Sequence, residues 1–399
     1  MIERLLSDIV MFSTADWASQ YWTNKQHTAA RLAARGHRVL YVESVGLRRP
    51  GLNRIDAVRL AARLRRGLVA PAQVRDNLWV LSPLTVPMGR RFGAIKAFND
   101  RQLRMRIGDW MRQQKVLRPL IWTYHPFMLE AAEALDPSMI IYHCVDDLGA
   151  IPGIDQATFG HAERSLLARA DLTFATSHRL QERCAAVAGS RAHYFGNVAD
   201  VGHFARARHV HDLPPELARI PRPRLGYIGV LSDFKIDFAL LETLVSAHRD
   251  WHFIFIGDQR EGQNSDVVAR LILRSNVHFL GSRSYHELPE YMAGFDVALL
   301  PQLINDYTRS MFPMKFFEYL AAGLPVVSTP LPALRDFAAV HSLAPDATGF
   351  AAAISAALSG RGPAPPGVDK PLLQENSWDA RLDQMMAIVE TTSARHRAS

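Results

Sequence analysis

The chain has 399 residues, of which 48% are hydrophobic and 21% are charged, and its mean hydropathy is −0.05. This composition is typical of a soluble globular protein and argues against a disordered or membrane-spanning chain. The length suits two or three domains, and we expect two. With two cysteines, Cys144 and Cys184, a disulfide framework is excluded, and the default location is the cytoplasm.

The net charge of +7 is carried by the first half of the chain. Residues 1–205 hold 27 Lys and Arg against 18 Asp and Glu, a net of +9, and the remainder holds 19 against 21, a net of −2. The basic residues form two clusters: Arg48, Arg49, Arg54, Arg59, Arg63, Arg65, Arg66 and Arg75, then Arg90, Arg91, Lys96, Arg101, Arg104 and Arg106.

A solvated arginine-rich face would explain both clusters, and so would contact with an anionic partner. Interleaved apolar residues favour an anionic membrane surface. Nucleic acid is disfavoured because no aromatic platform or nucleic-acid motif accompanies the charges. We therefore expect a peripheral protein at the inner face of the plasma membrane that binds no nucleic acid.

The first half predicts a parallel α/β sheet. A strand at 9–12, a helix at 24–35 and a strand at 39–42 form a βαβ unit, with Gly36 where the helix ends. Further strands are predicted at 79–81, 120–124, 139–143 and 172–176.

A proline-rich stretch at 206–224 predicts a linker, and a second alternation of strands and helices follows it. The strands are expected at 224–228, 251–256, 277–280, 297–300 and 325–328, with helices at 238–247, 285–293 and 313–322. The predicted domains are 1–205, 206–375 and a C-terminal helix, 376–399, that returns toward the N-terminal domain. Two doubly wound domains bind ligands at the carboxyl ends of their strands, in a cleft between them.

The segment 310–329, SMFPMKFFEYLAAGLPVVST, carries the clearest functional signal. A helix that begins near Pro313 presents free N–H groups and a positive dipole end, which suit a diphosphate, and Lys315 adds a full charge. Glu318 lies one turn on, where a carboxylate can accept both ribose hydroxyls. An ordinary amphipathic helix with a Lys–Glu pair would show the same spacing.

The wider pattern Pro-x-Lys-x-x-Glu-Tyr-x-Ala-x-Gly-x-Pro-Val-Val, which starts at Pro313, resembles the donor-site signature of bacterial group 1 glycosyltransferases. The resemblance extends to the segments 226–232 and 255–258 and to Gly281. It implies the GT-B fold, in which two Rossmann-like domains face each other across a cleft. It also implies that the second domain holds the sugar nucleotide.

The resemblance implies roles for the matched positions. Glu318 corresponds to the ribose-binding carboxylate, the turn 310–315 to the diphosphate site, and the loop 227–232 to the facing loop. The donor-binding candidates are Gly229, Ser232, Lys235, Ser310, Met311, Pro313, Lys315 and Glu318. Two positions depart from the family pattern: Lys235 is followed by Ile236 rather than glycine, and Met311 replaces a glutamate that contacts the transferred sugar in many members.

In the first half, the strand at 139–143 runs into Asp146 and Asp147. Adjacent carboxylates point in different directions, so one can act as a general base while the other caps the next helix. Helix capping alone would explain both. The segment is similar to the strand end of a bacterial exopolysaccharide glucuronosyltransferase of GT-B fold, which implies that Asp146 is the base of an inverting displacement.

Three residues are acceptor-binding candidates because they follow strands of the first half. Asp16 and Trp17 occupy the loop after the first strand, and His125 follows the strand at 120–124. A tryptophan there can stack on a sugar ring, but packing against a neighbouring loop would also explain it. For His125, simple hydrogen bonding is the structural alternative. No metal-binding constellation is recognised, and no cofactor other than the sugar nucleotide is expected.

These observations predict a metal-independent glycosyltransferase, a hexosyl- or uronosyltransferase. We expect transfer from a nucleoside diphosphate sugar such as a UDP-sugar to a lipid-linked or polysaccharide acceptor in exopolysaccharide or other cell-surface glycan biosynthesis. The alternatives are a nucleotide-sugar 2-epimerase of the same fold and a non-catalytic glycan-assembly partner.

Overall fold

The computed structural model describes residues 7–19, 21–44, 70–83, 93–151, 153–259 and 266–398. The chain divides into two compact units, which we call the first domain (Met1–Phe195 with Leu382–Ser399) and the second domain (Gly196–Arg381). The division after Phe195 comes before the expected one at 205/206, because α7 (Val201–Ala205) packs on α13 (Lys315–Ala322) within the second domain.

Most of the predicted basic clusters lie outside the described residues. This applies to Arg48, Arg49, Arg54, Arg59, Arg63, Arg65, Arg66, Arg90 and Arg91. Of the described members, Arg75 lies over the rings of Trp17 and Trp22, and Lys96 pairs with Asp100 and Glu130.

The first domain is built on an eight-stranded sheet in the order β3-β4-β2-β1-β5-β6-β7-β8. Its strands are β1 (Asp8–Phe12), β2 (Arg38–Val42), β3 (Ala72–Arg75), β4 (Leu78–Leu81), β5 (Leu120–Thr123), β6 (Met139–Cys144), β7 (Leu172–Ala175) and β8 (Ala192–Tyr194). All neighbours pair in parallel except β3, which runs antiparallel to β4 at the edge.

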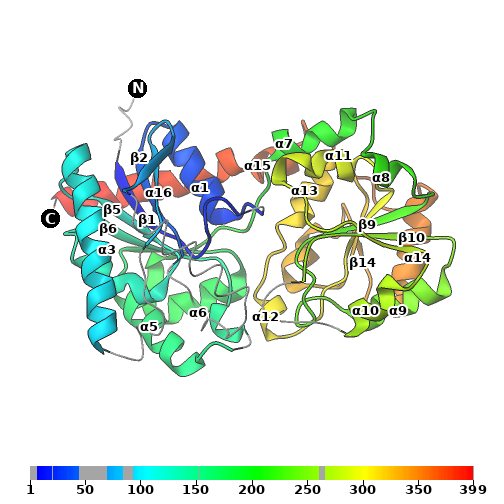
Figure 1. Ribbon diagram of the computed structural model, residues 1–399, viewed down its shortest axis with the longest axis horizontal. Helices are drawn as coiled ribbons and strands as arrows, with labels where there is room; N and C mark the ends of the chain where they lie inside the picture. Colours follow the sequence, from blue (N-terminus) through cyan, green and yellow to red (C-terminus); the bar gives the residue numbers. More distant parts are fainter. Residues whose placement is uncertain are drawn as a thin grey trace. The chain divides into compact units, whose positions relative to one another are not determined.

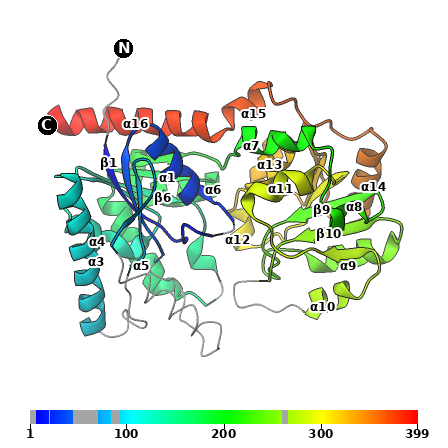
Figure 2. The same cartoon turned by 45° about the horizontal axis from the view of Figure 1, so that its top comes forward.

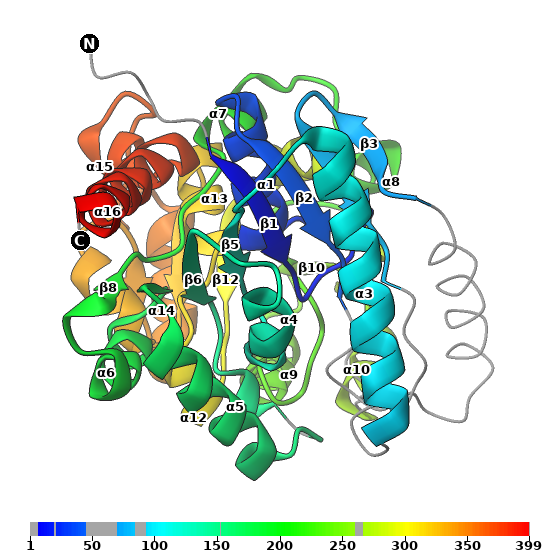
Figure 3. The same ribbon diagram turned by 90° about the vertical axis from the view of Figure 1, so that its left-hand side faces the viewer.

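Helices cover both faces of this sheet (Figure 3). One face packs on α3 (Gly93–Gln114), α4 (Leu129–Glu133), α5 (Gln156–Arg169) and α6 (His178–Ala188), and the other packs on α1 (Asn24–Ala34) and α16 (Trp378–Ala398). Short 3-10 turns follow β5, β6 and α6: η1 (Pro126–Met128), η2 (Leu148–Ala150) and η3 (Gly189–Arg191). Buried side chains of α16, including Leu382 and Met385, are part of the core of the first domain.

Helix α1 follows β1 and has clear boundaries in the sequence. Thr23 caps its first turn in a capping box with Gln26. Gly36 follows the helix with φ +94°, a left-handed conformation that glycine adopts without a steric penalty. The first turn of α1 is thus held in a fixed conformation near the carboxyl end of β1.

The second domain has a six-stranded parallel sheet in the order β11-β10-β9-β12-β13-β14. Its strands are β9 (Arg224–Ile228), β10 (His252–Ile256), β11 (Val277–Phe279), β12 (Val297–Leu300), β13 (Val326–Ser328) and β14 (Ser342–Leu343). The expectation of two parallel, Rossmann-like sheets is therefore confirmed.

Helices also flank this second sheet on both sides (Figures 1 and 2). One face packs on α9 (Phe238–Ala247), α10 (Asp266–Ile272) and α14 (Ala347–Leu358). The other helices and turns are η4 (Arg206–His209), α8 (Pro215–Ala218), η5 (Tyr285–Glu287), α11 (Leu288–Met292), α12 (Asp306–Arg309), η6 (Pro332–Phe337) and α15 (Pro371–Glu375).

Each sheet has a switch point, where the strand order reverses. In the first domain the chain winds outward from β1 through β2 and then returns to β5 on its other side. In the second domain β9 and β12 are neighbours in the same way. Loops at the carboxyl ends of such neighbouring strands diverge and leave space for a ligand. The two switch points are therefore where functional side chains are expected.

The packing of β9 leaves no space for a side chain at Gly226. A Cβ atom there would lie 2.0 Å from Cδ2 of Phe295. We predict that Gly226→Ala lowers the free energy of unfolding by about 1–3 kcal/mol, because the ring must move within a packed core.

Urea unfolding measures this change, with Gly202→Ala on α7 as the control. A Cβ atom at Gly202 would meet no atom within 4 Å, so the stability of Gly202→Ala should equal or slightly exceed that of the parent protein. Equal stability of Gly226→Ala and the parent protein would contradict the close packing.

Candidate functional site

The loops after β9 and β12 hold several of the donor-binding candidates and are joined by hydrogen bonds. The N–H of Lys235 donates to the Ser232 carbonyl at 3.0 Å, and the N–H of Leu303 donates to the Lys235 carbonyl at 2.9 Å. Nδ2 of Asn305 donates to the Phe234 carbonyl at 2.6 Å. The two loops thus form one connected rim at the β9/β12 switch point.

Helix α13 presents Lys315 in its first turn and Glu318 on the same face. Lys315 Nζ and Glu318 Oε2 form an ion pair, with 20% and 2% of the two side chains exposed. Burial raises the pKa of Glu318 above its ordinary value of 4.5, the charge of Lys315 opposes this rise, and the charge of Asp200 adds to it. The helix therefore holds a buried carboxylate beside a cation.

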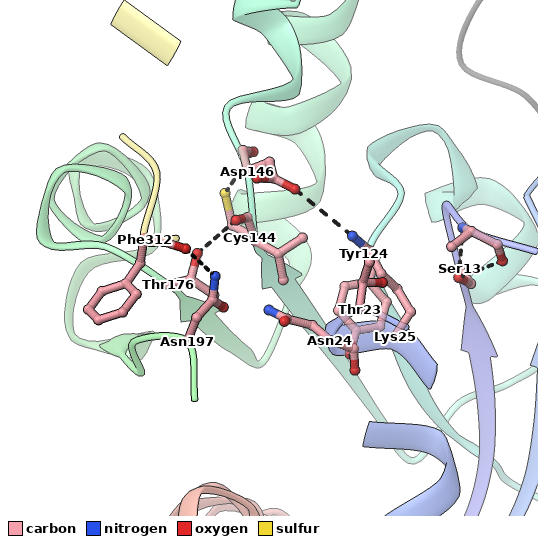
Figure 4. Close-up of polar contacts among 12 residues, drawn as sticks. Ser13, Thr23, Asn24, Lys25, Tyr124, Cys144, Asp146, Thr176, Asn197 and Phe312 are labelled. Atoms are coloured by element: carbon pink, nitrogen blue, oxygen red, sulfur yellow. Dashed lines mark hydrogen bonds and ion pairs between the residues drawn. The ribbon is translucent and has the colours of Figure 1, made fainter. Parts of the chain in front are cut away.

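Hydrogen bonds hold the middle and the last turn of α13, and the segment ahead of it, within the second domain. The N–H of Ile228 donates to the hydroxyl of Tyr319 at 2.8 Å, which joins the helix to the end of β9. Nε and Nη2 of Arg208 donate to carbonyls of the last turn at 2.8 and 2.9 Å. Ahead of the helix, Nδ2 of Asn197 donates to the Phe312 carbonyl at 2.7 Å (Figure 4).

Four further donor-binding candidates lie around the start of α13 and in the loop after β9. Ser232, Ser310 and Pro313 are buried, and Met311 is half-buried. Oγ of Ser310 donates to the Asp306 carbonyl at 3.2 Å. The helix begins at Lys315 rather than at Pro313, so the segment 310–314 is a turn between α12 and α13.

The last two donor-binding candidates, Gly229 and Lys235, belong to the loop after β9. A Cβ atom at Gly229 would lie 2.7 Å from the hydroxyl of Tyr227, so this close approach requires glycine. The ammonium of Lys235 lies 5.0 and 5.1 Å from the ring centres of Phe234 and Tyr307. The donor candidates predicted from the sequence therefore all lie in the segments that follow β9 and β12, two neighbouring strands of the second sheet.

In the first domain, Asp146 and Asp147 follow β6, and their carboxylates diverge as expected. Oδ2 of Asp146 lies 4.0 Å from Nζ of Lys25, and the dashed line in Figure 4 joins these two groups. Oδ1 of Asp147 lies 2.7 Å from Nη1 of Arg183. Asp147 stands at the start of η2, but its side chain makes no capping hydrogen bond there. It forms the ion pair with Arg183 in place of the expected helix cap.

Arg183 binds a second carboxylate as well. Its Nη2 lies 3.3 Å from Oε1 of Glu163 on α5, whose side chain is 9% exposed. Glu163 also accepts a hydrogen bond from the hydroxyl of Tyr142 at 2.7 Å. This cluster ties the loop after β6 to α5 and α6, and it holds Asp147 turned away from Lys25.

Lys25 is the second residue of α1, and 8% of its side chain is exposed. Its ammonium lies 5.6 Å from the ring centre of Tyr124, which follows β5. Burial, with the charge of Lys25, lowers the pKa of His143 to about 3, so this neighbouring imidazole is neutral. Lys25 thus brings a buried cation within 4.0 Å of the Asp146 carboxylate.

The acceptor-binding candidates Asp16 and Trp17 lie in the loop after β1. The Asp16 carbonyl accepts a hydrogen bond from Nε2 of Gln26 at 3.0 Å. The ring of Trp17 packs 5.3 Å from that of Tyr41 and lies 5.7 Å from the guanidinium of Arg75. Packing against residues of β2 and β3 therefore accounts for Trp17, and acceptor binding by this loop stays a prediction.

His125, the third acceptor-binding candidate, is fully buried. Its Nδ1 accepts a hydrogen bond from the N–H of Phe127 at 3.3 Å and so caps η1. Hydrogen bonding within the fold thus accounts for His125, and its contact with an acceptor stays a prediction.

Within the described parts of the chain, no three His, Cys, Asp or Glu side chains are grouped so that they could hold a metal ion. The helices of the same residues include none that is long and apolar enough to cross a bilayer.

Sequence reasoning did not find Lys25, Arg183, Tyr319 or Arg208. Their partners lie in other segments of the chain, so no local spacing connects them. For Lys25 one signal was present: the Thr-x-x-Gln capping box places this lysine in a helical first turn directly after the loop of the first strand.

Comparison with known families finds a match in the second domain. Residues 222–360 match the family model described as "Glycosyl transferases group 1". A 109-residue segment is 38% identical to the putative teichuronic acid biosynthesis glycosyltransferase TuaH of Bacillus subtilis. The match spans 27% of this chain and 27% of that protein. The expected resemblance to group 1 glycosyltransferases is therefore confirmed over this part of the chain.

Solved structures show the fold over nearly the whole chain. A sucrose-phosphate synthase from Thermosynechococcus elongatus superposes with a TM-score of 0.69 at 19% identity, covering 98% of this chain and 100% of the other. Anabaena HepE in complex with UDP-glucose gives 0.62 at 16% identity, covering 96% and 100%. A trehalose 6-phosphate synthase from Burkholderia multivorans gives 0.65 at 13% identity, covering 99% and 100%. The expected GT-B fold is confirmed.

The raised pKa of Glu318 predicts how stability depends on pH. A carboxyl whose folded-state pKa is raised stabilises the fold below its unfolded pKa, and this contribution is lost as the pH rises through the folded value. Glu318→Gln, which mimics the protonated form, should therefore raise the melting temperature at pH 7 and lose this advantage below pH 4.5.

Thermal unfolding across this pH range tests the expectation. The exposed Glu375→Gln in the same domain is the control and should leave the melting temperature unchanged at both pH values. A drop in melting temperature for Glu318→Gln at pH 7 would show that the ion pair with Lys315 outweighs the cost of burial.

Proposed function

We propose that the chain is a glycosyltransferase that moves a sugar, a hexose or a uronic acid, from a UDP-sugar to a lipid-linked or polysaccharide acceptor in cell-surface glycan biosynthesis. The observation that carries the proposal is the Lys315–Glu318 pair on α13, at the β9/β12 switch point and within the segment 222–360 that matches the group 1 model. The neighbour HepE, in complex with UDP-glucose, supports a uridine nucleotide.

In this proposal the second domain holds the donor. Lys315 and the N–H groups of the first turn of α13 neutralise the diphosphate, and Glu318 accepts the ribose hydroxyls. Leaving-group charge is thus stabilised by a cation and a helix end, without a metal ion. Gly229 has no side chain, so the main chain after β9 can approach the donor closely.

The first domain supplies the base. Asp146 takes the proton of the acceptor hydroxyl, the acceptor oxygen attacks the anomeric carbon, and the bond from that carbon to the diphosphate oxygen breaks. The nucleoside diphosphate leaves with the bonding electrons. Asp146 is preferred over Asp147 because Asp147 is held by Arg183 at 2.7 Å, and 30% of the Asp146 side chain is exposed compared with 18% for Asp147.

The acceptor and the location belong to the same proposal. The B. subtilis relative is named for teichuronic acid biosynthesis, which supports a surface polysaccharide. Helix α3 exposes Arg101 and Arg104 next to Phe98 and Met105, a basic and apolar face that suits an anionic membrane. We therefore place the enzyme in the cytoplasm, peripheral to the inner face of the plasma membrane.

Nucleotide binding is tested by thermal unfolding with a panel of nucleoside diphosphates and their sugars. A ligand at 100 times its dissociation constant stabilises the folded state by about 2.7 kcal/mol. UDP and one UDP-sugar should raise the melting temperature most, and Lys315→Met should remove most of the rise. An equal response of Lys315→Met and the parent protein would exclude α13 as the donor site.

Asp146→Asn tests the base through UDP release from the UDP-sugar that stabilises the protein best. Loss of a general base should reduce the rate by about 100-fold or more, with UDP binding intact. Asp136→Asn, an exposed carboxylate of the same domain, is the matched control and should keep the full rate. Full activity of Asp146→Asn would remove Asp146 as the base, and binding without turnover in the parent protein would favour a non-catalytic role.

A further inference from the structure

Lys25 stands where a lysine is unfavourable on two counts. It is in the first turn of α1, where the unpaired N–H groups and the helix dipole repel a cation. Its side chain is 8% exposed, so the ammonium has given up most of its water. Local structure alone therefore favours an apolar or acidic side chain at this position.

The counter-charge of Lys25 is the carboxylate of Asp146. The two groups point toward one another from α1 and from the loop after β6, with 4.0 Å between Nζ and Oδ2 (Figure 4). This separation is longer than a hydrogen bond, and Asp146 is 30% exposed, so the pair contributes little to folding. The pair is therefore better suited to orienting the carboxylate than to stabilising the fold.

The loop after β6 is held by a different pair. Arg183 binds Asp147 at 2.7 Å and Glu163 at 3.3 Å, and these contacts fix the main chain at Asp147. The loop that carries Asp146 is thus tied to α6 through the neighbouring Asp147, and the partly exposed side chain of Asp146 is directed toward Lys25. The ammonium of Lys25 lies over the ring of Tyr124 and places a positive charge on that side.

We propose that Lys25 is a positioning residue whose buried ammonium fixes the direction in which the Asp146 carboxylate points. The inference rests on the proposed function, in which Asp146 takes the acceptor proton. A base must lie within hydrogen-bond reach of that proton, and small displacements of a reacting group reduce rates strongly. Lys25 itself exchanges no proton in this step.

The test compares Lys25→Met and Lys25→Arg with the parent protein in three measurements. Crystal structures should show the Asp146 side chain displaced or disordered in Lys25→Met, with the Arg183–Asp147 pair unchanged. The melting temperature of Lys25→Met should equal or exceed that of the parent, because a buried cation is replaced by an apolar side chain. The kcat for UDP release from UDP-glucose should fall by about tenfold with KM unchanged, and Lys25→Arg should restore part of the rate.

Lys96→Met removes another ion-paired lysine of the first domain and should leave all three measurements unchanged. An Asp146 side chain that keeps its position in Lys25→Met, or a lower melting temperature of that variant, overturns the inference; the crystal structures decide it without any substrate. Failure of the proposed function is recognised separately, because there Asp146→Asn releases UDP at the full rate whatever Lys25→Met does.

Discussion

A carboxylate whose side chain is only 2% exposed must be compensated by neighbouring charges or hydrogen bonds, and Glu318 on α13 is such a group. The second domain is organised around that requirement. Lys315 supplies the charge from the same face of the helix. Tyr319 ties the helix to the end of β9, and Arg208 binds its last turn. Because the middle and the last turn of the helix are held, the pair has a defined position relative to the loops at the β9/β12 switch point.

The first domain separates two neighbouring carboxylates by the same kind of electrostatic constraint. Arg183, shared with Glu163, holds Asp147 against α5 and α6, while Asp146 turns toward Lys25 on α1. One residue of the pair therefore anchors the loop, and its neighbour is the base in the proposed function. The partners come from three helices, α1, α5 and α6, and the parallel sheet brings them together at the carboxyl ends of its strands.

The sequence predicted the central strands because their apolar runs are buried on both faces, as in β1, β6 and β9. It missed β3, β8 and β14, since an edge strand such as Ala72–Arg75 has no buried side chain and shows no periodic signal. At the site, the i, i+3 spacing of Lys315 and Glu318 was visible locally. The partners of Asp146 and Asp147 were not, because an ion pair between distant segments exists only after the sheet has formed.

The Lys315–Glu318 pair has a consequence for selectivity under the proposed function. An isolated phosphate ion that attracted Lys315 would leave the buried carboxylate of Glu318 without its counter-charge, and a nucleoside alone would offer hydroxyls to a carboxylate that is already satisfied. A ligand that brings an anionic group and a pair of hydroxyl donors together compensates both side chains at once. Under the proposed function, the pair would therefore bind a whole nucleotide in preference to inorganic phosphate, which is abundant in cells.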